Sequence, residues 1–191
     1  MTLAEIEEQV LQHNPEYLAE FGGVRLGKLA PYIETAVRSL SKRNWISVGH
    51  RSQLVSCLRG ASIESLGNGS TSYKIAPTIG TPGDRALQSV GLAISSKRPV
   101  LCILGNTALS DGKFFEALNV ATLKKSPVLF MVLERQTSSM PVSTALSTSI
   151  EHIAGALGMT THLCADTNSL AAQVGAFDGE HGPVLIRVDI S

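Results

Sequence analysis

Two short glycine-containing segments are the first places in this sequence where chemistry could occur. Gly80-Thr-Pro-Gly83 and Gly105-Asn-Thr107 both lie beside segments with a regular apolar pattern. Glycine lets a backbone turn sharply and come close to a ligand. Either segment taken alone is an ordinary turn. A phosphate loop of the Gly-x4-Gly-Lys type is missing from the sequence, so a generic nucleotide-binding α/β protein is the weakest of the functions we weigh.

Other kinds of site are not supported by the residue spacing. Four histidines lack acidic or cysteine neighbours at ligand spacing, so we expect them to be structural or exposed: His13, His152, His162 and His181. The three cysteines are widely spaced and odd in number, which fits neither a disulfide framework nor a zinc cluster. We expect them to be small buried residues of a protein in a reducing compartment. A Ser-His-Asp arrangement is not recognisable either.

Composition and charge narrow the class of protein. The chain has 191 residues, 43% hydrophobic and 17% charged, which is typical of one globular domain. Sixteen basic and sixteen acidic residues cancel, so charge does not favour nucleic acid or an anionic membrane as a partner. The longest apolar runs, such as 127–133, are too short to cross a bilayer. The first ten residues carry three glutamates and no basic apolar leader, so we expect a cytoplasmic protein.

The periodicity of apolar residues predicts the elements that must position any site. Continuous apolar runs predict strands at 44–48, 100–104, 127–133, 161–164 and 184–188. Amphipathic patterns predict helices at 28–42, 52–58, 84–95, 112–124, 149–157 and 169–177, and Thr2-Leu-Ala-Glu5 is a capping box for a first helix. Residues 60–83 and 134–147 are expected to be mainly loops.

This alternation predicts an α/β fold, a three-layer sandwich with a mainly parallel sheet covered on both faces. We expect one domain, with N-terminal helices in residues 1–43 packed on an α/β unit of residues 44–191. Ligands of such sheets bind beyond the carboxyl ends of the strands. The loops that follow Val48, Leu104 and Leu133 are therefore the expected site.

The segment from Gly105 to Gln136 resembles the thiamine-diphosphate motif, which begins Gly-Asp-Gly and ends in a pair of asparagines. The matching letters are Gly105, Gly112, Phe115-Glu-Ala-Leu-Asn119, Ala121 and Pro127-Val128. Three further segments are similar to transketolase elements in the same order: Ser47-Val-Gly-His50, Gly80-x-x-Gly83-x5-Ser89-Val-Gly91-x-Ala93, and Gly182-Pro-Val-Leu-Ile-Arg-Val188. The resemblance covers residues 44–189 and points to transketolases and the alpha chains of 2-oxo-acid dehydrogenases. It implies their Rossmann-like, thiamine-diphosphate-binding fold.

The resemblance implies thiamine diphosphate and magnesium as cofactors. Carried over by position, the magnesium ligands are Asn106, Glu134 and the backbone carbonyl of Gln136. The family has aspartate and asparagine at the first two positions, so this sequence departs from the pattern. Either the pair has exchanged roles, which leaves one carboxylate and one amide as oxygen ligands, or the metal site has decayed.

The resemblance also assigns contacts to the diphosphate. They fall on His50, Gly80, Gly83, Arg85, Gly105, Asn106 and Thr107. His50 would touch the diphosphate or a substrate, and it is the catalytic candidate. Thr107 replaces a glycine and crowds the backbone approach. Arg85 either grips a phosphate bidentately or fills the cofactor space, although an arginine at a helix start is more commonly solvated.

Thiamine-diphosphate chemistry needs a second domain that packs on the aminopyrimidine, and this chain resembles only the diphosphate-binding half. We therefore expect a homo-oligomer, or a hetero-oligomer with a pyrimidine-binding subunit, acting on a small-molecule ketose or 2-oxo acid by carbon–carbon cleavage or transfer. Residues 60–83 and 134–147 would border the partner. The alternative is a catalytically degenerate homologue that serves as an oligomeric interaction or scaffold protein.

Overall fold

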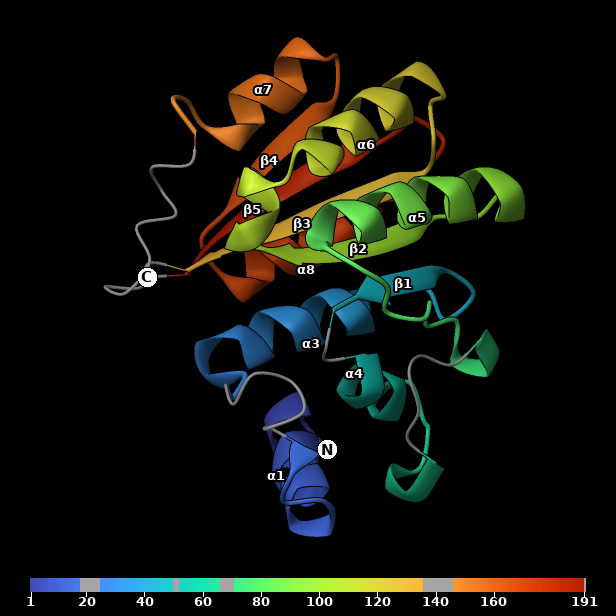
Figure 1. Ribbon diagram of the computed structural model, residues 1–191, viewed down its shortest axis with the longest axis vertical. Helices are drawn as coiled ribbons and strands as arrows, with labels where there is room; N and C mark the ends of the chain where they lie inside the picture. The colour runs from blue at the N-terminus through green and yellow to red at the C-terminus, as the bar shows by residue number, and fades with distance from the viewer. Residues whose placement is uncertain (18–24, 50–51, 66–70, 136–145, 191) are drawn as a thin grey trace.

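A five-stranded, all-parallel sheet forms the middle layer of the molecule (Figure 1). The computed structural model describes residues 1–17, 25–49, 52–65, 71–135 and 146–190. The strand order is β1-β2-β3-β5-β4. The strands are β1 (Trp45–Val48), β2 (Val100–Gly105), β3 (Val128–Arg135), β4 (Thr160–Cys164) and β5 (Val184–Ile190). The predicted three-layer α/β sandwich is confirmed, and all strand pairs within it are parallel.

Helices cover both faces of this sheet (Figure 1). One face carries α5 (Pro82–Ser96), α6 (Gly112–Leu123) and α7 (Ile150–Ala156), and the other carries α1 (Leu3–His13), α3 (Ala30–Ser39), α4 (Ser52–Leu58) and α8 (Thr167–Ala176). Successive β2 residues alternate between the two cores, because side chains of a strand point to opposite faces: Leu101 and Ile103 join the α3 side, while Cys102 and Leu104 join the α5 side.

The N-terminal helices are part of the core on the α3 side. Thr2 and Glu5 form the predicted capping box, and Leu3 and Ile6 are buried in the same cluster as Ile46 of β1. Helix α3 packs against α8, and the Tyr32 hydroxyl donates a hydrogen bond to the carbonyl of Ala165 at 3.2 Å. Within the described ranges, no helix combines the length and the apolar character needed to cross a membrane.

Three local differences from the predicted elements matter for the site. The expected loop after β2 is a 3-10 helix, η4 (Asn106–Ser110). Strand β3 continues through Glu134, because β5 pairs with it there and aligns Glu134 with Asp189, so the expectation of a loop beginning at this glutamate is wrong. The region of residues 60–83 contains short 3-10 helices, η2 (Ile63–Ser65) and η3 (Thr71–Tyr73), and Ile75 forms a bridge with Ile46. A further 3-10 helix, η1 (Gly27–Leu29), precedes α3.

Candidate functional site at the carboxyl edge of the sheet

Strands β1, β2 and β3 end at one edge of the sheet, as the sequence predicts. Gly105 is aligned with Leu133 in the β2–β3 register. The two metal-ligand candidates, Asn106 and Glu134, therefore follow neighbouring residues on adjacent strands. His50 and Gln136 fall outside the described residues, so their assigned roles stay predictions.

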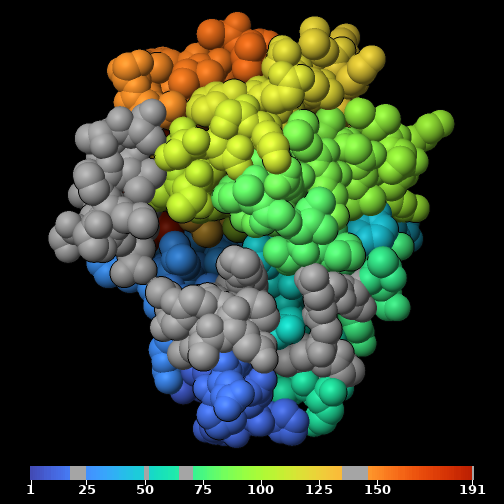
Figure 2. All heavy atoms as spheres, in the orientation of Figure 1, coloured from blue at the N-terminus to red at the C-terminus, as the bar shows by residue number. Residues whose placement is uncertain are grey.

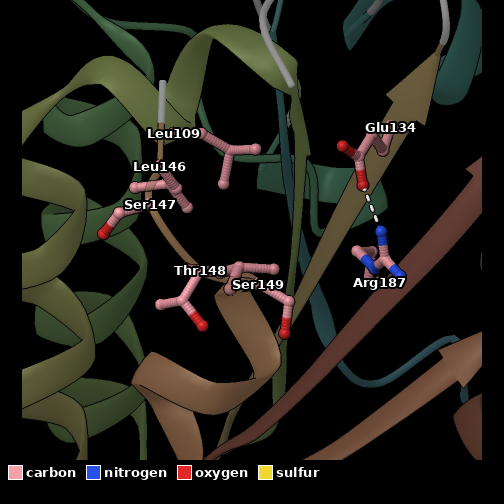
Figure 3. A pocket seen from close by; sticks show the side chains of 8 residues that line it. Leu109, Glu134, Leu146, Ser147, Thr148, Ser149 and Arg187 are labelled. Atoms are coloured by element: carbon pink, nitrogen blue, oxygen red, sulfur yellow. Dashed lines mark hydrogen bonds and ion pairs between the residues drawn. The ribbon is translucent and has the colours of Figure 1, made fainter. Parts of the chain in front are cut away.

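Glu134 is held by an arginine of the neighbouring strand (Figure 3). Its Oε2 accepts from Nη1 of Arg187 on β5 at 2.6 Å, and Nε of the same arginine donates to Oε1 of Glu151 on α7, also at 2.6 Å. The three side chains are only 16–22% exposed. Burial by itself would lower the pKa of Arg187, but its hydrogen bonds to Glu134 and Glu151 prevail and raise that pKa. One cation thus compensates two carboxylates.

A pocket of about 270 Å³ opens beside this ion-pair group. Leu109, Leu146 and Ile150 give it an apolar lining, and three consecutive hydroxyl residues, 147–149, here called the hydroxyl wall, line it as well. Figure 3 shows the hydroxyl side chains across the pocket from Glu134 and Arg187. Ser149 caps α7 by accepting from the N–H of His152, so part of this hydroxyl wall is already used within the chain.

The N-terminus of α5 is closed by a carboxylate from the chain itself. Oδ2 of Asp111 accepts from the N–H of Gly83 at 2.8 Å, and its Oδ1 accepts from the N–H of Lys113 at 3.1 Å. A Cβ at Gly83 would lie 2.6 Å from Cγ of Asp111 and from Cβ of Lys113. The hydrogen bond from the Thr81 side chain, then those from the two backbone N–H groups, lower the pKa of Asp111. Gly83 is therefore needed for the close approach of Asp111, which fills the space expected for a ligand.

A second carboxylate secures the same helix start. Thr81 and Asp84 form a capping box, and Nζ of Lys113 lies 2.6 Å from Oδ1 of Asp84. This bond to Lys113, followed by the bonds from Thr81, lowers the pKa of Asp84 to about 2. Gly80 has φ +43°, and a Cβ there would collide with the Asp84 carboxylate. Figure 2 shows the start of α5 and η4 next to each other on the surface.

Arg85 is buried rather than solvated, contrary to the commoner outcome for an arginine at a helix start. It is 7% exposed and faces the sheet. Its guanidinium lies against Gly49, where an ideal Cβ would be 3.3 Å from Nη2. Its charge also acts on the Cys102 thiol, which is bonded to the hydroxyls of Ser89 and Ser47. Arg85 thus lies over the end of β1 and the middle of β2.

The backbone directly after β2 is accessible at the surface. Gly105 and Thr107 are exposed and Asn106 is half-buried, all at the start of η4. A Cβ at Gly105 would meet no atom within 4 Å. Across the described residues, no group of three or more His, Cys, Asp or Glu side chains is arranged to hold a metal ion.

These residues do not fit a resident magnesium ion. Magnesium prefers carboxylate oxygens in near-octahedral geometry. The Glu134 carboxylate at the predicted site is already ion-paired with Arg187 at 2.6 Å, and a dication next to it would be repelled by that guanidinium. The Asp111 carboxylate at Gly83 would likewise repel a diphosphate.

Three residues of this edge were missed by sequence reasoning: Asp111, Glu151 and Arg187. Arg187 stands within an apolar strand segment, Val-Leu-Ile-Arg-Val, and a charge in such a run is a signal for a buried ionic partner. Asp111 precedes a helix start and was predicted only as a loop residue. Nothing in the sequence distinguishes Glu151 from an ordinary acidic residue in the first turn of a helix.

The chain is similar in fold to solved structures of thiamine-diphosphate enzymes. A structure of an enzyme of Mycobacterium smegmatis described as thiamin diphosphate-dependent matches with a TM-score of 0.60 and 19% identity, over 83% of this chain and 31% of that one. The inactive beta4 tetramer of a split-gene transketolase matches with a TM-score of 0.56 and 16% identity, over 86% of this chain and 51% of that one.

The chain therefore spans about half of the transketolase chain and about a third of the other. At these identities the likeness shows the fold, which is the one the sequence resemblance implied. A comparison with known family profiles and one with curated protein sequences gave no match.

Proposed function

We propose that this chain is a catalytically degenerate homologue of enzymes with the thiamine-diphosphate-binding fold. It would serve as an oligomeric interaction or scaffold subunit. The observation that carries the proposal is the position of Arg187 between Glu134 and Glu151. The side chain at the predicted magnesium position is held by an internal cation. A magnesium ion on Glu134 would have to compete with a guanidinium that lies 2.6 Å from its Oε2.

The closed start of α5 supports the same proposal independently. Helix N-termini bind phosphate through free N–H groups and the helix dipole. Here the N–H of Gly83 is taken by Asp111, and the N–H of Asp84 by the Thr81 hydroxyl. Two carboxylates therefore occupy the region where a diphosphate would need positive potential. The N–H groups of Gly83 and Asp84 are thus already hydrogen-bonded within the chain.

An assembly with further copies or with a second chain is part of the proposal. The two similar structures extend well beyond the region that this chain matches, and one of them is a tetramer by its description. In those proteins the remaining part of the chain would cover a face of the matched domain. We propose that a further copy of this chain or a second chain covers the corresponding face here. We propose a cytoplasmic subunit, with residues 1–43 as N-terminal helices packed on an α/β unit of residues 44–191.

A second candidate function is an active diphosphate-binding subunit that completes its site with a pyrimidine-binding partner. The β2–β3 register favours it, because it brings one amide and one carboxylate, Asn106 and Glu134, to adjacent strand ends. In that case thiamine diphosphate and magnesium would bind here, His50 and Gln136 would complete the contacts, and the substrate would be a small ketose or 2-oxo acid.

Calorimetric titration with thiamine diphosphate, with and without magnesium, separates the two functions. The chain is tested alone and together with any pyrimidine-binding chain encoded beside it, as wild type, Asn106→Ala and Glu134→Ala. Glu116→Ala is the control, since Glu116 is exposed on α6. We expect no magnesium-dependent binding in any sample. Magnesium-dependent binding that is lost in both site variants and kept in the control would overturn the proposal in favour of the second candidate.

Light scattering tests the scaffold part of the proposal. We expect the chain to form a defined oligomer, alone or with its partner, at micromolar concentration. A chain that stays monomeric with and without that partner would contradict the scaffold role.

A further inference from the structure

The two edges of the sheet differ in how the rest of the chain covers them. At the β1 edge, the N–H of Ile46 donates to the carbonyl of Lys74, and the Ile46 carbonyl accepts from the N–H of Ala76, both at 2.8 Å. This segment forms a parallel bridge to β1 and covers part of that edge. Strand β4 is the other edge, and in the described part of the chain β5 is the one strand paired with it. An edge strand presents a row of backbone N–H and C=O groups that can pair with another strand.

The β4 edge lacks the features that usually prevent such pairing. Charged side chains, proline or a bulge protect most natural edges. Residues 158–165 contain no Asp, Glu, Lys, Arg or Pro, and the register of β4 with β5 is continuous from Thr160 to Cys164. Leu163 on this strand is 56% exposed. Strand β4 is therefore a regular, uncharged edge that carries an exposed leucine.

The helices beside β4 extend this uncharged surface. Both α7 and α8 contact β4, and Figure 1 shows α7 alongside the strand. Residues 152–177 contain one Asp, Glu, Lys or Arg residue, Asp166, although 17% of the whole chain is charged. The Asp166 carboxylate accepts from the N–H groups of Asn168 and Ser169 at the start of α8. Depletion of charge is typical of the centre of a protein interface.

We infer that β4 pairs antiparallel with β4 of a second copy of this chain, about a two-fold axis at His162. In a two-fold interface the same patch of both copies meets itself. A charged patch would repel its own copy, whereas the uncharged strand of residues 158–165 meets itself without repulsion. The inference rests on the oligomeric role under the proposed function and names the surface that forms the oligomer.

His162 is the middle residue of β4, so an axis there pairs the whole strand, Thr160–Cys164, with its copy. Thr161 of each copy then lies opposite Leu163 of the other. Side chains of a strand alternate between faces, and Cys164 belongs to the core on the α3 side, so Thr161 and Leu163 share the α7 side. The pairing covers the exposed leucine with a β-branched side chain, a cross-strand contact that stabilises sheets.

Sedimentation equilibrium of the full chain tests the surface. The variant is Leu163→Lys, and Leu123→Lys is the matched control, because Leu123 is 73% exposed at the end of α6. We expect a wild-type dimer, a dissociation constant at least tenfold higher for Leu163→Lys, and no change for Leu123→Lys. Thermal unfolding followed by circular dichroism establishes that each variant is folded.

Two double variants test the register. Thr161→Lys with Leu163→Glu places opposite charges in both cross-strand pairs, so this chain should associate at least tenfold more tightly than Leu163→Glu alone. Thr161→Lys with Leu163→Lys places like charges in the same pairs and should be monomeric.

A cross-link at the axis gives a second measurement that does not depend on affinity. Oxidation of His162→Cys should join two copies through a disulfide, because the new thiols face each other at the two-fold axis. The three native cysteines are buried, so the wild type should give no covalent dimer. Leu123→Cys is the control for random collision and should not cross-link.

Three results would each overturn the inference: a wild type that is monomeric by itself, a dimer that survives Leu163→Lys, or a dimer that His162→Cys fails to cross-link. An oligomer that persists in Leu163→Lys would use another surface, and the proposed scaffold function would stand. Magnesium-dependent binding of thiamine diphosphate would refute only the proposed function, since β4 pairing does not involve the carboxyl edge of the sheet.

Discussion

The carboxylate of Asp111 accepts a hydrogen bond from the backbone N–H of Gly83, 28 residues earlier in the chain, at 2.8 Å. This bond joins the starts of α5 and α6, because Asp111 is also the N-cap of α6. One side chain therefore satisfies N–H groups of two helices that would otherwise be unpaired. The same bond removes the strongest anion-binding feature that the glycine-rich segment could have offered.

Replacing Gly83 with alanine should destabilise the protein. The new Cβ would lie 2.6 Å from Cγ of Asp111 and Cβ of Lys113, so the helix starts must separate, at a cost of about 1–3 kcal/mol. Gly91→Ala is the control, because Gly91 is in the same helix with nothing within 4 Å of its Cβ position. That change should stabilise by up to about 1 kcal/mol. Urea denaturation measures both, and equal effects would contradict the close contact.

Removing the Arg187 cation should cost more than a surface substitution. Arg187→Met leaves Glu134 and Glu151 as two uncompensated carboxylates, 18% and 16% exposed. Breaking a buried pair costs about 3–5 kcal/mol, so a loss of about 2–3 kcal/mol is expected after allowance for partial exposure. The triple variant with Glu134→Gln and Glu151→Gln should recover part of it. Chemical denaturation checks this, and a single variant as stable as wild type would show that Arg187 is not a structural counter-ion.

The ion pair between Asp84 and Lys113 at the start of α5 predicts that the free energy of unfolding depends on pH in the acid range. The pKa of Asp84 is lowered from 3.8 to about 2, chiefly by Lys113. A carboxylate with a lowered pKa contributes stability above its ordinary value and loses it as the pH falls through the folded one. The free-energy difference between wild type and Asp84→Asn should thus be constant above pH 5 and shrink between about pH 4 and 2. Denaturation at several pH values tests this, and a free-energy difference that stays constant down to pH 2 would contradict the ion pair.

The buried thiol of Cys102 should be inert in the native protein. Burial raises its pKa from 9.0 to about 11, and the side chain is 0% exposed. A thiol reagent at pH 8 should therefore react with Cys102 only after denaturation. Since the unfolded chain ionises first, this thiol should also lower stability as the pH rises from about 9 toward 11. Comparison with Cys102→Ala isolates both effects, and rapid native labelling at position 102 would contradict the burial.

Periodicity predicted the sheet and its helices because apolar runs and amphipathic stripes are local properties of the chain. The capping box at Thr2 and the strand 184–188 are examples, and the structure has both. The bonds at the carboxyl edge join residues far apart in sequence, such as Glu134 and Arg187. No regular spacing of residues in the sequence predicts such a pair.

The same limit explains Arg85 and Gly83. Sequence position marked both residues as site candidates, but their burial and contacts depend on how α5 meets the sheet and α6. A glycine required by a neighbouring carboxylate looks the same in sequence as one required by a phosphate. The sequence therefore located the edge without revealing that Asp111 fills part of it.

The packing of α3 against α8 has a consequence for synthesis on the ribosome. Helix α3 is complete at residue 39, whereas the helix that covers it ends at residue 176. The hydrogen bond from Tyr32 to Ala165 spans 133 residues. During translation α1 and α4 can pack against α3 early, but the contact of α3 with α8 cannot form until nearly the whole sheet has emerged. Folding of this side of the sheet should therefore be completed late, when α8 has left the exit tunnel, rather than helix by helix.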